Sequence, residues 1–453
     1  MPSQQKIKDI LKYIKECSPG QDEFYQATEE VLFTLRPLLN EDKRYLEHNI
    51  LERIVVPERS IIFKINWLDD AGKIQTNLGY RVQFNSSIGP YKGGLRFHPT
   101  VNLGIMKFLG FEQIFKNALT GLQIGGAKGG SNFDPKGKSD NEIMKFCQAF
   151  MSELYKHIGK HKDVPAGDIG VGAREIGYLF GQYKKLTGEF EGVLTGKGLN
   201  WGGSNARKQA TGYGSVYFAE NFLNKYEKSL KGKKCAVSGS GNVAIYTIEK
   251  LYEMGAIPVS CSDSKGTIYQ EEGIDLKALK VIKELHHESL EEYATVDCRC
   301  DYIPLSKYPE GGHAVWHIPC DVAFPSATQN ELTLVDAIAL NENGCILINE
   351  GANMPTTPEA YDFIKKNNIL FSPGKAANAG GVATSQLEMS QNASMAQWSF
   401  EEVDIKLRTI MQNIFKTAYD TSVEFDCEGD LVTGANIAGF RKVADSMIDQ
   451  GAV

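Results

Sequence analysis

Lys128 stands inside a run of glycines, Gly125-Gly126-Ala127-Lys128-Gly129-Gly130, and its surroundings suggest chemistry more than those of any other residue. Glycine has no Cβ, so backbone or ligand can approach it closely. The apolar Leu122 and Ile124 just before the run indicate an interior position, where an ammonium group is partly desolvated. Burial and a neighbouring positive charge both lower the pKa of a lysine. Lys128 is therefore a candidate for acid–base chemistry near neutral pH.

Two more lysines and one carboxylate lie in similar surroundings in the same half of the chain. Lys92 falls in Pro90-Tyr91-Lys92-Gly93-Gly94-Leu95-Arg96-Phe97, Lys116 in Gln113-Ile114-Phe115-Lys116-Asn117, and Asp168 in a loop bounded by glycine and proline, residues 163–170. Three converging lysines suit a dicarboxylate, with two as point-charge partners and the third as the chemical group. A single lysine is more often a solvated surface charge. The glycine-rich sequence that recurs around these lysines favours a substrate-binding site instead.

A phosphate-binding turn is predicted in the second half. Residues 233–238 read as a strand that runs into Gly239-Ser240-Gly241-Asn242-Val243-Ala244, and residues 245–254 read as a helix. A glycine turn at a helix N-terminus presents free N–H groups to a pyrophosphate. Ala244 replaces the third glycine of the usual fingerprint, which is an allowed variant, and Asp263 follows the next strand about 20 residues on. The pattern favours dinucleotide binding over a turn without a ligand.

The elements that must position these groups follow from hydrophobic periodicity. Residues 4–55 are helical, with Pro37 ending or kinking the second helix, and residues 61–67 and 79–84 are strands joined by a turn at 69–72. Two helices follow, near 102–119 and 139–159. From about 201 to 375 short apolar strands alternate with helices, which predicts a doubly wound parallel sheet. A long amphipathic helix near 400–424 and a short C-terminal helix end the chain.

We therefore predict an α/β protein of two domains. The first is an N-terminal substrate-binding and oligomerisation domain with a mixed sheet and helices, residues 1–200 joined by 425–453. The second, residues 201–424, is a doubly wound, Rossmann-type dinucleotide-binding domain.

Composition excludes several classes of function. The 453 residues are 42% hydrophobic and 23% charged, which is typical of a globular protein with a large core. A net charge of -7 gives no electrostatic footprint for nucleic acid or an anionic membrane. No apolar run is long enough for a membrane span, and the polar start lacks the core of a secretory signal. Nine cysteines, an odd number, fit reduced thiols and a cytoplasmic protein.

The motifs together resemble those of the hexameric glutamate dehydrogenases of the short microbial type, members of the Glu/Leu/Phe/Val dehydrogenase family. The likeness spans nearly the whole length. The stretches that carry it, besides the two glycine-rich runs, are residues 90–99, 165–172, 207–214, 327–331, 349–355 and 378–382.

The resemblance implies roles for individual residues. Lys92 and Ser385 would hold the side-chain carboxylate of glutamate, and Gln113 and Lys116 its α-carboxylate. Lys128 would be the catalytic lysine and Asp168 the proton shuttle. Further substrate contacts would come from Gly167, Asn378 and Val382, and further cofactor contacts from Arg207, Thr211, Gly239, Ser240, Gly241, Asn242, Val243, Asp263, Ser264, Lys265 and Asn353. The implied reaction is the reversible deamination of glutamate to 2-oxoglutarate and ammonium, in a homohexamer.

The cofactor is expected to be NADP, with NAD as the alternative. A carboxylate such as Asp263 usually accepts from the ribose 2′-hydroxyl and would repel a 2′-phosphate, which favours NAD. The surrounding Ser262-Asp263-Ser264-Lys265-Gly266 instead offers hydroxyls and a cation, with Lys277, Lys280 and Lys283 following. This run resembles NADP-type members of the family, with Ser264 and Lys265 as phosphate contacts.

Two other functions and a metal site agree less well with the sequence. A leucine, valine or phenylalanine dehydrogenase would lack a charged residue at the Lys92 position, and an inactive homologue would have lost Lys128 or Asp168. A metal could use some of Cys298, Cys300, His313, His317 and Cys320. However, Cys-x-Cys is tighter than the usual spacing and Cys320 opens a buried strand, so no metal is expected.

Overall fold

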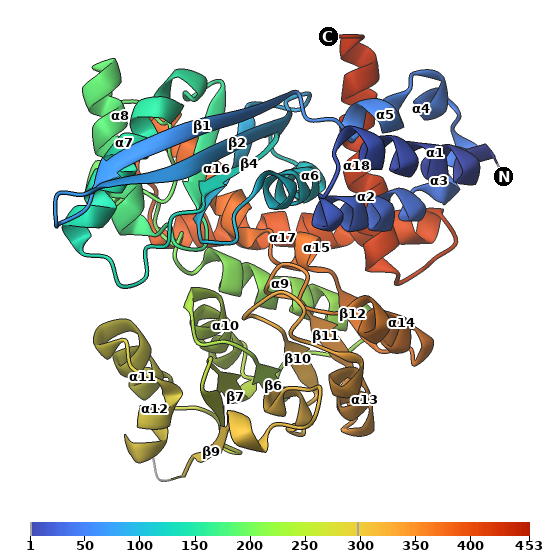
Figure 1. Cartoon of the computed structure of the whole chain (residues 1–453). Coiled ribbons are helices and arrows are strands. Elements are labelled where there is room, and N and C mark those ends of the chain that lie inside the picture. Colours follow the sequence, from blue (N-terminus) through green and yellow to red (C-terminus); the bar gives the residue numbers. More distant parts are fainter. Residues whose placement is uncertain (1, 297–298) are drawn as a thin grey trace. The chain divides into compact units, whose positions relative to one another are not determined.

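The computed structural model describes residues 2–296 and 299–453 and divides into two compact units (Figure 1). The first unit contains the chain up to Arg207 together with Val382–Val403 and Thr433–Val453. The second contains Lys208–Gly381 and Asp404–Val432. These bounds differ from the predicted ones at residues 201–207 and 425–432 and, most of all, at residues 382–403. That segment holds most of helix α16 (Gly380–Ser394), whose polar side chains bond to residues 196–204 of the first unit.

A mixed five-stranded sheet forms the centre of the first unit, as predicted. Its order is β1-β2-β4-β3-β5, where β1, β2 and β4 are antiparallel and β3 and β5 run parallel to β4. The strands are β1 (Arg59–Leu68), β2 (Ile74–Asn85), β3 (Tyr91–Phe97), β4 (Gly126–Ser131) and β5 (Asp163–Gly167). Both predicted strands, 61–67 and 79–84, are confirmed as β1 and β2.

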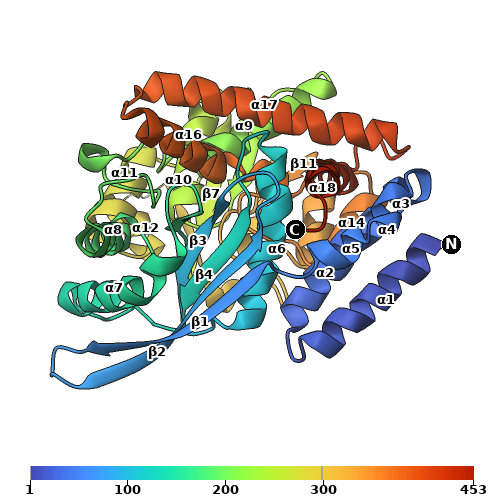
Figure 2. The same ribbon diagram turned by 90° about the horizontal axis from the view of Figure 1, so that it is seen from above.

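Helices cover the two faces of this sheet. Helix α6 (Leu103–Leu119) packs on β2 and β4, and α7 (Asp140–Leu154) with α8 (Ala173–Thr187) lies on the other face (Figure 2). Alternate residues of β3 point to opposite faces. Leu95 and Phe97 enter the core under α7, where Phe97 packs edge-on against Phe146. Residues 92, 94 and 96 therefore face the opposite side of the sheet, where the predicted lysine site lies.

Three strands of this sheet, β3, β4 and β5, were not predicted, and the run 163–170 that we read as a loop contains the whole of β5. Glycine is uncommon inside strands, which hid them. Here the glycines let neighbouring backbones come unusually close. A Cβ on Gly93 would lie 1.6 Å from the carbonyl oxygen of Ala127, and one on Gly126 would lie 2.9 Å from the backbone of Ile114. Lys128 is therefore held on a rigid strand.

The remaining helices of the first unit include five at its N-terminal end and one at its C-terminal end. They are α1 (Pro2–Cys17), α2 (Asp22–Thr34), α3 (Arg36–Glu41), α4 (Arg44–Glu47), α5 (Ile50–Ile54) and α18 (Leu431–Gln450). Pro37 sits in the first turn of α3, so the predicted break before it is confirmed. The C-terminal helix is not short as we expected, since it has 20 residues.

The second unit is built on a seven-stranded sheet of order β12-β11-β10-β6-β7-β8-β9. The strands from β12 to β7 are parallel, which confirms the predicted doubly wound core, and β8 and β9 extend it antiparallel. They are β6 (Lys234–Val237), β7 (Ile257–Ser262), β8 (Gly266–Tyr269), β9 (Asp301–Pro304), β10 (Val322–Phe324), β11 (Leu347–Asn349) and β12 (Leu370–Ser372).

Helices flank both faces of this second sheet. Ile348 packs in a core with Trp316 and Leu340, whereas the neighbouring Asn349 points the other way and donates to Ser215 on α9. The helices are α9 (Ala210–Lys225), α10 (Asn242–Glu253), α11 (Leu276–Lys280), α12 (Leu290–Val296), α13 (Leu334–Glu342), α14 (Pro358–Lys366), α15 (Gly374–Ala377) and most of α17 (Phe400–Glu424), with a π-helical turn at Val281–His286.

Candidate active site

Lys128 and Asp168 form an ion pair in the first unit. Lys128 is 4% exposed on β4, and its Nζ donates to Oδ1 of Asp168 at 3.0 Å. Asp168 follows the last residue of β5, and its Oδ2 accepts from Nε of Arg96 at 2.6 Å. A Cβ on Gly94 would lie 2.9 Å from Cβ of Asp168 and 3.3 Å from Nζ of Lys128. The glycine on β3 thus makes room for the pair.

The pKa values of Lys128 and Asp168 are shifted by burial and by the charges of their neighbours. Burial lowers the pKa of Lys128, and the negative charge of Asp168 only partly opposes this. Burial alone would raise the pKa of Asp168, but Lys128 and Arg96 outweigh it and hold that pKa well below its usual range. Asp168 is therefore a carboxylate at neutral pH, and Lys128 is the member of the pair that still has a proton to give up in acid–base chemistry.

Lys92 and Lys116 belong to the same positively charged group. Lys92 is fully buried on β3, where its Nζ donates to Oγ1 of Thr195 at 2.8 Å. Burial, reinforced by the charge of Arg207, lowers the pKa of Lys92 well below its ordinary value. Lys116 is half-buried on α6, and burial with the charge of Lys128 lowers its pKa to about 8. The charge of Lys128 acts on Lys116, and the charge of Arg207 acts on both Lys116 and Lys92, so Arg207 links Lys92 to the other two lysines.

The other predicted substrate residues lie around these lysines. Gln113 lies on α6, and its Nε2 donates to Oδ1 of Asn117 at 2.6 Å; Asn117 in turn donates to the carbonyl of Lys92 at 3.1 Å. Gly167 is the last residue of β5, directly before Asp168. Val382 is half-buried in the first turn of α16, and Ser385, which is 1% exposed, lies one turn later.

Arg207 contacts a predicted substrate residue, although we predicted it as a cofactor contact. Its Nε donates to Oγ of Ser385 at 3.0 Å, within the first unit. Its charge also lowers the pKa values of Lys92 and Lys116. The guanidinium therefore belongs to the positive group around the substrate residues.

Sequence reasoning missed the partners that hold this group in place. Besides Arg96 and Thr195, a fully buried pair joins β2 to β5: Nε of Arg81 donates to Oδ2 of Asp163 at 2.9 Å, and its Nη1 donates to the carbonyl of Gly93 at 3.2 Å. A Cβ on Gly129 would lie 2.9 Å from Cδ of Arg81, so that glycine lets the side chain cross β4. The glycine run was the available signal, but the partner is 82 residues away in sequence.

The predicted phosphate turn has the form that a pyrophosphate needs. Gly239 follows β6 with φ of +81°, a left-handed conformation that favours glycine, and Gly241 is the N-cap of α10, which begins at Asn242. Ser240 and Val243 lie on either side of that start. A Cβ on Gly241 would meet no atom within 4 Å, which leaves open space at the helix N-terminus. The residues present thus fit a dinucleotide phosphate.

The Asp263 carboxylate already has partners. Its Oδ2 accepts from the backbone N–H of Leu290 at 2.8 Å and from Nζ of Lys283 at 3.2 Å, and its Oδ1 accepts from the backbone N–H of Lys265 at 2.9 Å. These bonds outweigh burial and lower its pKa. Ser264 and Lys265 are exposed beside it. Asp263 is therefore less available to a ribose hydroxyl than the sequence alone suggests.

The last predicted ligand contacts lie elsewhere in the second unit. Nδ2 of Asn378 donates to the carbonyl of Ala352 and to Oδ1 of Asn353, both at 2.9 Å. This fixes the amide and leaves its buried Oδ1 without a hydrogen bond. An amide oxygen held in this way can accept from an amine or carboxamide. Thr211 lies in the first turn of α9.

No metal centre is seen in the described part of the chain, where no group of three or more His, Cys, Asp or Glu side chains could hold an ion. His313 and His317 instead lie near opposite oxygens of the buried Asp336, at 3.5 and 3.3 Å. Cys298 lies outside the described residues. The described helices include none long and apolar enough to cross a membrane.

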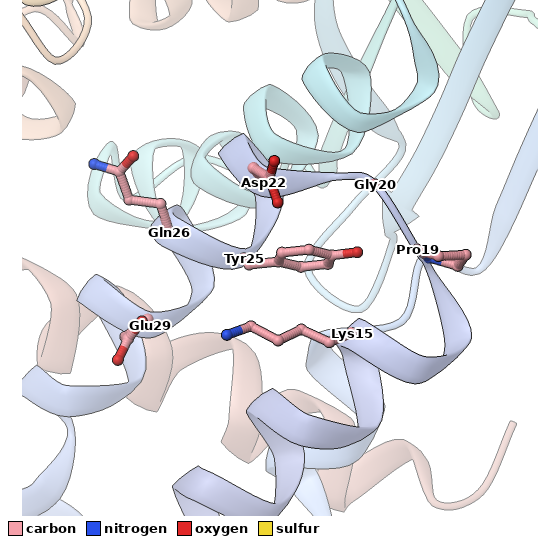
Figure 3. A pocket seen from close by; sticks show the side chains of 7 residues that line it. All are labelled: Lys15, Pro19, Gly20, Asp22, Tyr25, Gln26 and Glu29. Atoms are coloured by element: carbon pink, nitrogen blue, oxygen red, sulfur yellow. The ribbon is translucent and has the colours of Figure 1, made fainter.

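A surface hollow between α1 and α2 is separate from these residues (Figure 3). It has a volume of about 530 Å³ and is lined by Lys15, Tyr25, Glu29 and their neighbours. None of the residues predicted to bind substrate or cofactor lines it, so we assign it no role in the chemistry.

Comparison with known proteins gives the same class of enzyme. The family model described as "Glutamate/Leucine/Phenylalanine/Valine dehydrogenase" matches residues 202–451, and "Glu/Leu/Phe/Val dehydrogenase, dimerisation domain" matches residues 57–185. The chain therefore belongs to the Glu/Leu/Phe/Val dehydrogenase family.

Its relatives are glutamate dehydrogenases. The NADP-specific glutamate dehydrogenase of Helicobacter pylori (strain ATCC 700392 / 26695) is 61% identical over 98% of this chain and 99% of that protein. The NAD(P)-specific glutamate dehydrogenase of Xylanibacter ruminicola is 52% identical over 98% and 99%. The crystal structure of Plasmodium falciparum glutamate dehydrogenase matches with a TM-score of 0.96 and 51% identity, over 100% of this chain and 96% of that one.

Proposed function

We propose that this chain is an NADP-dependent glutamate dehydrogenase, which interconverts L-glutamate with 2-oxoglutarate and ammonium. The observation that carries the proposal is the Lys128–Asp168 pair at 3.0 Å beside two further buried or half-buried lysines. One acid–base pair and two more cations are what an amino dicarboxylate needs. Lys92 and Ser385 hold the side-chain carboxylate, and Lys116 and Gln113 hold the α-carboxylate.

The proposed chemistry divides between Lys128 and Asp168. Residues 239–243 would hold NADP, which would supply the acceptor for the hydride lost from the α-carbon of glutamate, and loss of that hydride gives an imine. Lys128 in its neutral form takes a proton from the water that adds to the imine carbon. Asp168 carries protons to and from the substrate nitrogen until ammonium leaves. Reductive amination runs through the same steps in reverse.

The roles of the two units follow from where these residues lie. The first unit supplies the substrate and acid–base groups, with Arg207 among them. The second unit supplies the cofactor contacts, namely the Gly239–Val243 turn, Thr211, Asn353 and the Asp263–Lys265 corner, and Asn378 at the nicotinamide.

An alternative within the family is an enzyme for aliphatic or aromatic amino acids. Lys92 argues against it, because a fully buried ammonium group at the side-chain end has no use with an apolar substrate. The use of NAD is the other alternative, and the relative named as NAD(P)-specific supports it. The Lys283 and Leu290 bonds to Asp263 favour NADP.

A spectrophotometric assay tests the proposal. Purified protein with 2-oxoglutarate and ammonium should oxidise NADPH much faster than NADH. It should act far more slowly when 2-oxoglutarate is replaced by 4-methyl-2-oxopentanoate, which lacks the second carboxylate. Equal or better rates with the branched oxo acid would contradict glutamate as the substrate.

We also propose that the enzyme is a homohexamer in the cytoplasm. Strand β1 is a ten-residue edge strand, and Ile62, Leu68, Ile74 and Leu78 on the β1–β2 hairpin are between 42% and 69% exposed. An edge of that length with apolar side chains is a surface that self-association can cover. The eight described cysteines are all free thiols, which suits a reducing compartment. Light scattering should give about 300 kDa for six chains of 50.1 kDa.

A further inference from the structure

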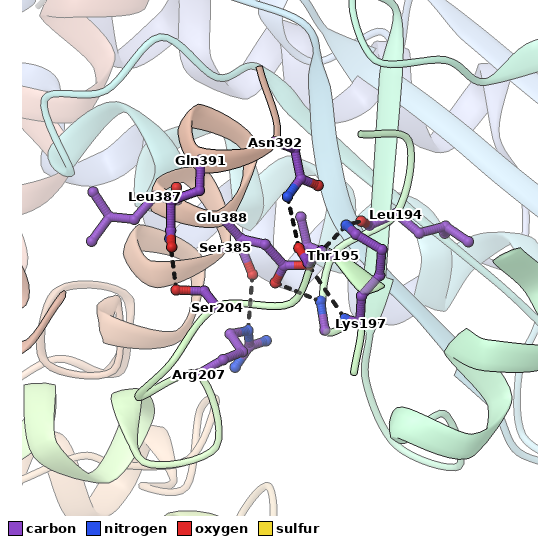
Figure 4. A network of polar contacts seen from close by, with 12 residues as sticks. Leu194, Thr195, Lys197, Ser204, Arg207, Ser385, Leu387, Glu388, Gln391 and Asn392 are labelled. Atoms are coloured by element: carbon purple, nitrogen blue, oxygen red, sulfur yellow. Dashed lines mark hydrogen bonds and ion pairs between the residues drawn. The ribbon is translucent and has the colours of Figure 1, made fainter. Parts of the chain in front are cut away.

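One buried ion pair of the first unit has no part in the acid–base chemistry. Nζ of Lys197 donates to Oε1 of Glu388 at 2.8 Å, with side-chain exposures of 1% and 0%. The backbone N–H of Gly196 donates to Oε2 at 2.9 Å and that of Lys197 to Oε1 at 3.3 Å (Figure 4). Three donors from residues 196–197 thus converge on one carboxylate of α16.

The Lys197–Glu388 pair joins residues 195–197 to helix α16, and each of these two segments carries a hydroxyl group of the proposed substrate site. Thr195 directly precedes Gly196, and its Oγ1 accepts from Nζ of Lys92 at 2.8 Å. Ser385 lies three residues before Glu388, on the same side of α16, and accepts from Arg207 at 3.0 Å. Figure 4 shows Ser385 and Glu388 projecting from the helix toward residues 194–207. The spacing between the Lys92–Thr195 contact and the Ser385–Arg207 contact is therefore set by Glu388.

The buried Lys197–Glu388 pair is not explained by a contribution to the stability of the fold alone. Two charges lose their hydration when they are buried, and apolar side chains of the same volume often stabilise as well or better. A buried carboxylate with several fixed donors does define one geometry, because displacement leaves each donor unpaired. Precise placement is what a pocket for a carboxylate needs, since an error of about 1 Å can cost about a hundredfold in rate.

We propose that Glu388 and Lys197 are positioning residues that set the binding site for the side-chain carboxylate of the substrate. The pair fixes the segment that carries Thr195 against the helix that carries Ser385, and so it determines selectivity for an amino dicarboxylate. This inference rests on the proposed function, in which Lys92 and Ser385 bind that carboxylate. Neither Glu388 nor Lys197 needs to touch the substrate.

The test compares two oxo acids of equal chain length, of which one lacks the distal carboxylate. For each variant, kcat/KM is measured with 2-oxoglutarate and with 2-oxopentanoate at saturating NADPH and ammonium. We expect Glu388→Gln to lower the ratio of the two values by tenfold or more, through KM for 2-oxoglutarate, while KM for NADPH stays the same. A general loss of stability would lower both rates together and leave the ratio unchanged.

Gln391→Met is the matched control. Gln391 is 2% exposed on the same helix, donates to Oγ of Ser204 at 2.8 Å and accepts from the backbone N–H of Trp398 at 2.9 Å. Its loss removes buried polar contacts of α16 without touching residues 194–197. We expect Q391M to lower the melting temperature and to keep the wild-type ratio.

A second variant keeps the test decisive if E388Q does not fold. Lys197→Met with Glu388→Leu buries no charge, yet it still removes the acceptor of the two backbone N–H groups, so the ratio should again fall. A folded E388Q or double variant with the wild-type ratio would overturn the inference alone. A wild-type protein that does not prefer 2-oxoglutarate would contradict the proposed function, and the inference with it.

Discussion

The two units present their ligand-binding groups in opposite ways. In the first unit the groups are long charged side chains, buried on strands or on α6 and already paired, as Lys128 is with Asp168 and Lys92 with Thr195. In the second unit they are mostly backbone N–H groups of the Gly239–Asn242 turn and exposed side chains such as Lys265. In the proposed function, substrate recognition is thus built into a dry interior, whereas cofactor recognition takes place at a helix end and an accessible corner.

This difference predicts where substitutions act most strongly. A buried charge that loses its partner is costly and poorly screened, so changes in the first unit should be large and specific. Interactions at an exposed corner are weakened by water and salt, so changes in the second unit should be modest.

Replacement of Lys128 by alanine should lower kcat about a thousandfold, because general acid–base groups contribute about 10² to 10⁴ in rate. The affinity for NADPH, measured by fluorescence titration, should stay the same because the cofactor turn lies in the other unit. Lys136→Ala, at an exposed position of the first unit, is the control and should be neutral. Near-normal turnover of K128A would remove Lys128 from the chemistry.

The double replacement Lys92→Leu with Ser385→Val should raise KM for glutamate about a hundredfold, since the side-chain carboxylate loses its partners in a buried site. The apolar pocket should then accept norleucine or methionine, which the wild-type enzyme uses poorly. Steady-state kinetics on the three amino acids measures the change. Unchanged glutamate kinetics would place both residues outside the pocket.

The site was predictable where its signal is local. The glycine run marked Lys128, the strand–turn–helix pattern marked residues 239–243, and hydrophobic periodicity marked β1, β2 and α6. The pairs that hold the site in place were not predictable, because Arg81 and Asp163 lie 82 positions apart, and Lys197 and Glu388 lie 191 apart. Only the folded sheet and helix bring such residues together.

The glycine-rich strands show a second limit. β4 has almost none of the β-branched and aromatic residues that strands favour, so its composition indicates a loop. Its strand conformation is imposed by its neighbours: it pairs with β2 from Gly126 to Ser131, with one register shift between Gln83 and Asn85, and with β3 from Gly129 to Ser131. In β3 a weak signal was available, since Leu95 and Phe97 alternate with glycine and arginine.

The pH dependence of substrate binding tests the proposed role of Lys116 in the first unit. With a pKa of about 8, Lys116 carries its charge below pH 8 and loses it as pH rises through that value. If the charged form binds the α-carboxylate as proposed, kcat/KM for glutamate should lose a contribution of about tenfold between pH 7 and pH 9. Lys116→Arg keeps the charge over that range.

The quantity to measure is the ratio of kcat/KM between wild type and K116R at each pH. The ratio cancels the titration of the substrate ammonium group, which is common to both enzymes. It should fall about tenfold from pH 7 to pH 9. A ratio that is flat with pH would mean that Lys116 does not titrate in this range or does not bind the carboxylate.

The smallest effect is expected at the cofactor corner of the second unit, where Lys283→Met should reduce the preference for NADP over NAD by about threefold to tenfold. Lys283 lies 3.2 Å from Oδ2 of Asp263, and its loss leaves the charge of Asp263 to repel a 2′-phosphate. The backbone N–H groups of Leu290 and Lys265 remain on that carboxylate, and solvent screens the corner, so the change should be moderate. The ratio of kcat/KM for NADP and NAD at saturating glutamate measures it, with the exposed Lys277→Met as control. An unchanged ratio would leave Ser264 and Lys265 as the determinants, and a wild-type preference for NAD would show that Asp263 accepts from the ribose despite its partners.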